Sequence, residues 1–139
     1  MDENEQRIVD EFRERRGAGR LGGGMDAAAL LLLTHTGART GARRTTPLMH
    51  LWLGGRLYVI ASAAGAARHP AWFHNLLAHP AVEVELGAER FPATAVVPRG
   101  RERDALFAEA VRTRPFLADH QARTDRAIPV VELRRADGR

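Results

Sequence analysis

Two consecutive glycines near the middle of the chain restrict its fold more than any other feature. Gly54 and Gly55 separate two strand-like segments, residues 46–53 and 56–62. A two-residue hairpin turn needs backbone angles that glycine adopts easily, so this pattern predicts two antiparallel strands joined by a tight turn. The sheet that contains them is therefore expected to be at least partly antiparallel.

Further strand-like segments lie on both sides of this hairpin. Residues 29–34 form an apolar run typical of a buried strand, and residues 129–133 indicate a final strand. Residues 82–86 alternate apolar and acidic side chains, which indicates a strand with one face in solvent. A Gly-Ala turn then leads into a strand at residues 90–97. Because strands and helices do not alternate regularly, we predict an α+β fold built on an antiparallel sheet or barrel.

The first part of the chain is predicted to be a helix followed by a flexible connector. Residues 2–16 are charged, with apolar side chains on one side of a helical period. The glycine-rich residues 17–24 break regular structure. Residues 1–24 are therefore expected to form an N-terminal helix and connector, and residues 25–139 the main domain.

Three further helices are predicted in the rest of the chain. Residues 69–77 form a short helix that Pro70 opens in its first turn, a position that proline tolerates. Residues 101–113 have apolar side chains near helical spacing, and residues 116–123 form a second short helix beside them.

The composition excludes several classes of chemistry. The chain has 139 residues and no cysteine, and all 21 of its Lys or Arg positions are arginine. Disulfides, thiolate metal sites and a cysteine nucleophile are therefore excluded, as is catalysis through a Schiff-base lysine. The net charge of +4 favours an anionic partner.

The sequence predicts a cytoplasmic protein without a transmembrane segment. Its longest apolar run, residues 27–33, is too short to cross a bilayer. The first residues are acidic, whereas a secretory signal begins with basic and then apolar residues. The N-terminal helix could contact a second copy, as in a homodimer, or a membrane surface, although its acidic residues allow only loose membrane association.

Metal and nucleic-acid binding are both disfavoured. His69, His74 and His79 are five residues apart, whereas two ligands on one helix face need a four-residue step. No carboxylate pattern completes such a site, so no metal is predicted. The chain has one tyrosine and two tryptophans and no basic stripe with interleaved aromatic residues, which disfavours a nucleic-acid-binding module.

The segment from Thr36 to Met49, TGARTGARRTTPLM, has the components of an anion-binding loop. Its glycines let the backbone approach a ligand, and Arg39, Arg43 and Arg44 offer guanidinium groups suited to phosphate. It has neither the Gly-Lys-Ser/Thr of a Walker loop nor the βαβ context of a dinucleotide fingerprint. From the residues alone, a phosphate cradle and a solvated basic turn both remain open.

Four segments in order resemble the deazaflavin (coenzyme F420)-dependent nitroreductase and quinone reductase family. They are TGARTG followed by RTTPL at residues 36–48, IASAAG at 60–65, HPAWFHNLL at 69–77 and RAIPVV at 126–131. With a matching glycine stretch at residues 21–24, the resemblance extends from about residue 20 to residue 133.

This resemblance implies a split β-barrel of the flavin-binding superfamily, with residues 25–139 as the cofactor-binding domain. The cofactor would be the 8-hydroxy-5-deazaflavin coenzyme F420. Such enzymes pass a hydride from reduced F420H2 to an electron-poor small-molecule acceptor, such as a quinone or nitro compound. The alternative is a split-barrel protein that binds flavin mononucleotide (FMN) or haem, but neighbouring arginines suit a longer anionic tail better than one phosphate.

The family motifs assign roles to individual residues of this chain. The phosphate and anionic tail would be held by Ala38, Arg39, Thr40 and Arg44. One side of the ring would be lined by Thr45, Thr46, Pro47, Leu48 and Met49. Backbone groups and an orienting Ser62 hydroxyl at the reacting edge would come from Ile60, Ala61, Ser62 and Ala63. The pocket would be closed by Ala71, Trp72, Phe73, His74 and Asn75.

Two departures from the family pattern affect this assignment. Ala63 stands where the family often has lysine, so one cationic contact to the cofactor is missing unless Arg68 replaces it. Relatives that activate nitroimidazoles have tyrosines around the acceptor, and this chain has Arg114, Leu117 and His120 at those places. Together with Met49, these residues are expected to bind an acceptor that is smaller or more polar.

Overall fold

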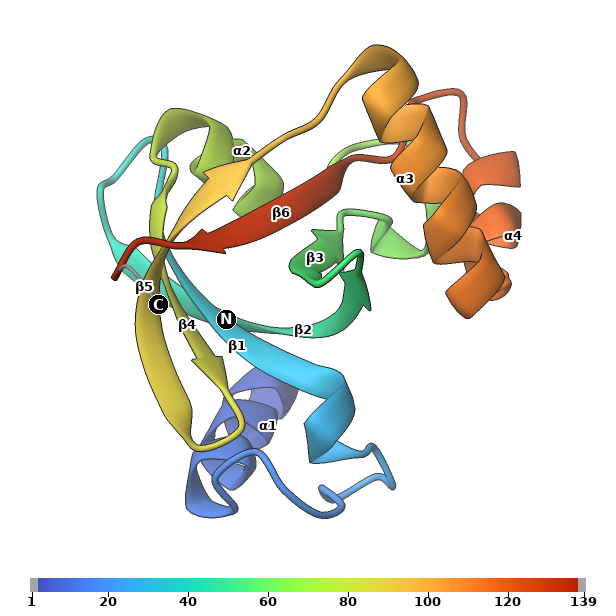
Figure 1. Ribbon diagram of the computed structural model, residues 1–139. Coiled ribbons are helices and arrows are strands. Elements are labelled where there is room, and N and C mark those ends of the chain that lie inside the picture. Colours follow the sequence, from blue (N-terminus) through green and yellow to red (C-terminus); the bar gives the residue numbers. More distant parts are fainter. Residues whose placement is uncertain (1–2, 138–139) are drawn as a thin grey trace.

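The computed structural model describes residues 3–137, in which six antiparallel strands close into a barrel (Figure 1). Their order around the barrel is β1-β2-β3-β6-β5-β4, and β4 pairs with β1 to close it. The predicted α+β fold, a split β-barrel with short flanking helices, is confirmed. The strands are β1 (Leu30–Thr36), β2 (Arg43–Leu53), β3 (Arg56–Ile60), β4 (Ala81–Leu86), β5 (Glu89–Val96) and β6 (Val130–Arg135).

Short helices flank the barrel on several sides. In Figure 1, α1 lies beside the β4–β5 hairpin, whereas α3 and α4 lie together next to β3 and the start of β6. Between residues 3 and 137, none of the helices is both long and apolar enough to cross a bilayer. The helices are α1 (Glu3–Glu14), the 3₁₀ helices η1 (Ala27–Ala29) and η2 (Ala63–Gly65), α2 (Ala71–Ala78), α3 (Gly100–Thr113) and α4 (Phe116–Ala122).

The central hairpin forms as its glycines predict. Gly54 and Gly55 have φ angles of 57° and 77°, the left-handed values that a tight two-residue turn needs. Leu53 pairs with Arg56 across the turn.

Three differences from the predicted boundaries affect the site. Pairing of β1 with β2 extends to Thr36 and Arg43, so Arg43 and Arg44 belong to a strand rather than to the loop. Pro70 is the residue before α2 rather than part of its first turn, with an extended ψ of 153°. Ser62 lies beyond the end of β3, at the start of η2.

The apolar run in β1 is buried on both of its faces. Leu31 and Leu33 point into the core inside the barrel, whereas Leu30 and Leu32 belong to a separate cluster outside it. That outer cluster includes Val9 and Phe12 of α1, each only 1% exposed. Successive side chains of a strand point to opposite faces, so packing of α1 explains why residues 30–33 of β1 are apolar on both faces.

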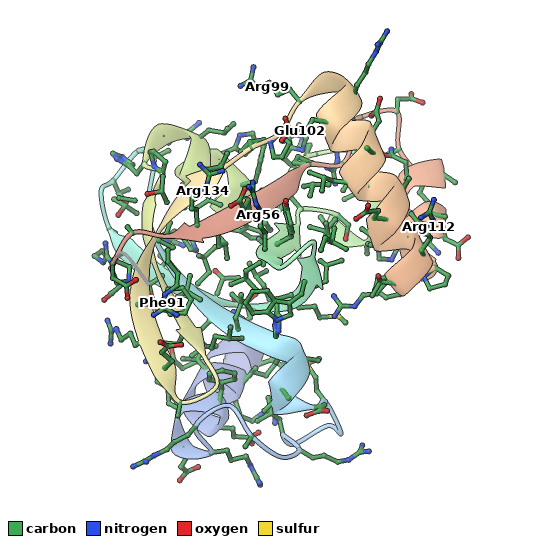
Figure 2. All side chains as sticks on the ribbon, in the orientation of Figure 1. Arg56, Phe91, Arg99, Glu102, Arg112 and Arg134 are labelled. Atoms are coloured by element: carbon green, nitrogen blue, oxygen red, sulfur yellow. The ribbon has the colours of Figure 1, made fainter. Side chains whose placement is uncertain are left out.

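A third apolar cluster joins α3 and α4 to the barrel wall. It contains Phe107 of α3 and Leu117 of α4, packed against residues of β2, β3 and β6. On the same wall, the buried carboxylate of Glu132 in β6 lies 3.5 Å from Arg56 and 3.0 Å from Arg134. Figure 2 shows these two arginines converging over β6. Two partners offset the cost of burying this charge.

Candidate cofactor and acceptor site

Two cavities meet at the N-terminal end of α2. The polar cavity has a volume of about 890 Å³ and is lined by Glu5, His35, Gly37, Ala38, Arg39, Thr40, Arg44, Thr46, Pro70, Ala71, Trp72, His74 and Asn75. The apolar cavity has a volume of about 340 Å³ and is lined by Ile8, Met25, Leu30, Pro47, Leu48, Met49, Ile60, Ser62, Ala63, Ala64, Pro70, Trp72, Arg114, Phe116, Leu117 and His120. Pro70 and Trp72 line both, so the two cavities adjoin.

The loop between β1 and β2 forms one wall of the polar cavity and is closed by its own hydrogen bonds. The N–H of Gly37 donates to the carbonyl of Ala42 (2.8 Å), and the N–H of Gly41 donates to that of Gly37 (2.9 Å). A Cβ on Gly37 would lie 2.8 Å from the Thr40 hydroxyl, which accepts a bond from the Ala42 N–H. The Thr40 side chain therefore stabilises the loop itself.

Strand alternation directs only one of the two arginines at the start of β2 to the polar cavity. Arg44 lines this cavity, whereas Arg43 points to the other face and lies 3.5 Å from Glu83 of β4. The three-arginine cradle expected from the sequence therefore contains two, Arg39 and Arg44. Among residues 3–137, neither of these has an ion-pair partner.

A hydrogen-bonded chain beneath the loop fixes its position on α2. The Asn75 carbonyl oxygen accepts from the Ala38 N–H (2.9 Å), so the Asn75 amide nitrogen faces His35 Nδ1 (3.1 Å) and donates to it. His35 Nε2 then carries the proton and donates it to the Thr46 hydroxyl (2.8 Å). His35 is 2% exposed, and burial, with the nearby charges of Arg44 and Arg43, lowers its pKa to about 4. The imidazole is therefore neutral at pH 7.

The donors of the polar cavity suit a ligand with several negative charges. Arg39 and Arg44 provide guanidinium groups, and Ala71 and Trp72 lie in the first turn of α2, whose N–H groups have no acceptor within the helix. No side chain caps this end of the helix. A helix N-terminus beside arginines is a favourable phosphate site. Glu5 is the one acidic residue in the lining.

The apolar cavity lies on the other side of Trp72. Leu48 of β2 and Ile60 of β3 line it, as do Met25, Met49 and Phe116, whose side chains are 44%, 43% and 41% exposed. Its polar groups are few, which makes it suited to a flat, largely apolar ring.

The three residues in place of the family tyrosines all line the apolar cavity, and each is held differently. The Arg114 guanidinium donates to the backbone carbonyl of His50, and burial lowers its pKa. Leu117 is 3% exposed and belongs to the α3–α4 cluster. His120 Nδ1 lies 3.2 Å from the Ser62 hydroxyl. This part of the site therefore offers one tethered cation, one apolar surface and one imidazole–hydroxyl pair.

Arg126 holds the segment that carries Ser62. Its guanidinium donates to the backbone carbonyls of Ala61 (3.1 Å), Ser62 (2.7 Å) and Ala66 (2.8 Å). It also contacts His69 Nδ1 (2.9 Å). One side chain thus ties residues 61–66 to the segment that precedes β6.

The structure brings most of the predicted site residues together but separates four from both cavities. Ala61 is fully buried, and Phe73 is 5% exposed within the barrel core. Thr45 points to the opposite face of β2, where its hydroxyl bonds that of Thr34 (2.9 Å). Arg68 lies in neither lining and is exposed. Within residues 3–137, no group of three His, Asp or Glu side chains is placed to hold a metal.

Sequence reasoning missed several residues of the site. His35 lies in the middle of the polar-cavity network, and only its position one residue before the TGARTG motif could have indicated a role. Ile8 and Met25 reach the apolar cavity from the N-terminal part of the chain. Phe116 was predicted only as the start of a helix, but it also lines this cavity.

Comparison with known proteins identifies the family. The family model described as "F420H(2)-dependent quinone reductase" matches residues 5–134. The chain belongs to this family. A quinone reductase of Mycobacterium tuberculosis that carries the same description is 39% identical over 121 residues, which cover 84% of this chain and 81% of that protein.

Two solved structures agree with this assignment. An F420H2-dependent reductase has a TM-score of 0.67 and 38% identity, covering 76% of this chain and 93% of its own. A protein described as a domain-swapped dimer has a TM-score of 0.69 and 35% identity, covering 91% of this chain and 96% of its own. The chain is therefore an F420H2-dependent oxidoreductase, and coenzyme F420 is its cofactor, as the motifs predicted.

Proposed function

We propose that the polar cavity binds the phosphate and acidic tail of F420, and that the apolar cavity takes its ring together with a small quinone. The observation that carries this proposal is the shared wall of the two cavities at Pro70 and Trp72. A cavity with two arginines opens beside an apolar one. That pairing matches a ligand with an anionic tail at one end and a flat ring at the other.

The residues have separate tasks in this proposal. Arg39 and Arg44 bind the anionic tail, and the N-terminal end of α2 adds backbone donors. Leu48, Met49 and Ile60 pack against the ring and exclude water from it. When bound, the reduced coenzyme supplies the hydride, so the chain needs mainly to bind, orient and desolvate the two reactants.

Replacing Arg44 with alanine tests the polar cavity, and Arg43→Ala is its matched control. Losing a guanidinium contact to an anion costs about 1.5–3 kcal/mol, or roughly 10- to 150-fold in affinity. We expect this loss for Arg44→Ala, together with weaker binding in added salt. Arg43 faces Glu83 on the other side of β2, so Arg43→Ala should bind almost normally.

The measurement is a fluorescence titration of each purified variant with oxidised F420 and, separately, with FMN. The wild type should bind F420 far more tightly than FMN, because two arginines can pair with more negative charge than one phosphate carries. Equal affinity for both cofactors would favour the FMN-binding alternative. Normal F420 binding by Arg44→Ala, with earlier thermal unfolding, would make Arg44 a structural residue.

We also propose that the protein forms a homodimer. This proposal rests on the relative at 35% identity that is described as a domain-swapped dimer and that matches 91% of this chain. Light scattering during size-exclusion chromatography tests it. A monomer at micromolar concentration would contradict it. The cytoplasmic location stays a prediction from the sequence.

A further inference from the structure

We propose that Ser62 and His120 act as a proton donor to the quinone in the apolar cavity. This inference rests on the proposed function, because it concerns the fate of the acceptor after hydride transfer. It is supported by a contact between two side chains that both line this cavity and that are 58 residues apart in the sequence. His120 Nδ1 lies 3.2 Å from the Ser62 Oγ.

Among residues 3–137, the Ser62 hydroxyl makes no hydrogen bond apart from its contact with His120. Ser62 stands at the N-cap of η2, where serine commonly bonds a backbone N–H, yet its side chain makes no such bond here. Its backbone carbonyl is instead held by Arg126 (2.7 Å). The main chain is thus fixed from outside the cavity, and the hydroxyl faces the imidazole.

The segment after Ser62 adopts a strained backbone that brings it against α4. Ala63 and Ala64 have φ angles of 46° and 54°, left-handed values that residues with a side chain rarely adopt. Such strain is concentrated at functional sites. Here it is maintained by Arg123 and Arg126, which donate to the carbonyls of residues 61, 62, 64 and 66.

A glycine allows the close approach between this segment and His120. A Cβ on Gly65 would lie 2.6 Å from the backbone carbonyl oxygen of His120. The Phe116 ring lies 5.2 Å from the imidazole, centroid to centroid. The imidazole is therefore a neighbour of both Ser62 and Phe116, which also line the cavity.

Reduction of a quinone to a hydroquinone requires a proton as well as a hydride, and such a pair can donate this proton. A hydride brings one proton and two electrons to the quinone, which becomes a hydroquinone anion with one negatively charged oxygen. The Ser62 O–H bond breaks as its proton forms an O–H bond on that oxygen. When the His120 imidazole is protonated, its Nδ1 proton passes to Ser62 Oγ in the same step, and the neutral imidazole that remains takes up a proton from solvent.

The test compares His120→Gln and Ser62→Ala with the wild type on two quinones. A methyl-substituted quinone gives a weakly acidic hydroquinone, which must be protonated. A chlorine-substituted quinone gives a more acidic one, which can leave as its anion. His79→Gln is the matched control, because His79 is exposed and lines neither cavity. An F420 titration of each variant confirms that it is folded and binds the cofactor.

With saturating reduced F420, both variants should lose roughly 10²-fold in turnover of the methyl quinone, the lower range for general acid catalysis. Turnover of the chlorinated quinone should change only slightly, and His79→Gln should match the wild type on both. Equal losses on both quinones would mean that the pair only positions the acceptor, and unchanged turnover would mean that it has no role. Either result overturns the inference. A wild type that binds F420 but reduces neither quinone would instead refute the proposed function on which it rests.

Discussion

Replacing His35 with glutamine should remove much of the acid sensitivity of the fold. The imidazole is buried between the Thr46 hydroxyl and the Asn75 amide, and it accepts a bond at Nδ1. Protonation would place a hydrogen on Nδ1, opposite a donor, and a charge beside Arg44 and Arg43. The native state therefore resists protonation, as the pKa lowered from 6.5 to about 4 indicates.

The size and sign of the effect follow from this pKa. As the pH falls below 6.5, the unfolded chain binds a proton before the native one does, so the free energy of unfolding decreases until about pH 4. Each pKa unit is worth about 1.4 kcal/mol, so the loss reaches about 3 kcal/mol when complete and about 2 kcal/mol between pH 7.5 and pH 5.

Urea unfolding of the wild type and of His35→Gln at these two pH values measures the effect. The variant is expected to be less stable at pH 7.5, because glutamine cannot reproduce both hydrogen bonds, but its stability should fall by about 2 kcal/mol less on acidification. The pKa values of His50 and His69 are also lowered by burial, and both residues are retained in the variant, so the difference isolates His35. His79→Gln, at an exposed position outside both cavities, is the matched control. An unchanged pH dependence in His35→Gln would refute this account of the buried imidazole.

Two further predictions concern the acceptor side of the site. Gly65→Ala should destabilise the protein by roughly 1–3 kcal/mol more than Gly87→Ala in the same unfolding assay. Both glycines have positive φ, but only at Gly65 would a Cβ meet backbone, so equal losses would contradict the tight packing against His120. Bicyclic nitroimidazoles should react slowly or not at all compared with small quinones, because Arg114, Leu117 and His120 do not offer both a ring face and a hydroxyl donor as tyrosine does. Steady-state assays with saturating reduced F420 measure this, and comparable turnover of both acceptors would contradict it.

The parts of the structure that sequence could predict are those fixed by local chemistry. The hairpin follows from Gly54-Gly55, and the closure of the β1–β2 loop follows from Gly37 and Gly41. Both depend on backbone angles or close approaches that glycine permits. The strand in β1 was predictable from its apolar run, although nothing local indicated that α1 would cover its outer face.

The parts that escaped prediction depend on register or on distant partners. Arg43 and Arg44 are adjacent in sequence, and only the pairing of Arg43 with Thr36 determines that Arg44, not Arg43, faces the polar cavity. His35 is bonded to Asn75, 40 residues away, through the packing of α2 on β1. No periodicity in either segment specifies such a contact.

Partly different elements of the fold line the two cavities. This separation allows the acceptor to change while the cofactor stays the same. The polar cavity consists largely of one loop, its supporting network and the start of α2, and its residues follow the family motif closely. The apolar cavity instead takes side chains from α1, η2 and α4, and the residues that differ from the family tyrosines lie on or just before α4. Neither Leu117 nor His120 contributes to the lining of the polar cavity. Substitutions on α4 can therefore alter acceptor binding and proton delivery without disturbing the arginines that hold the cofactor.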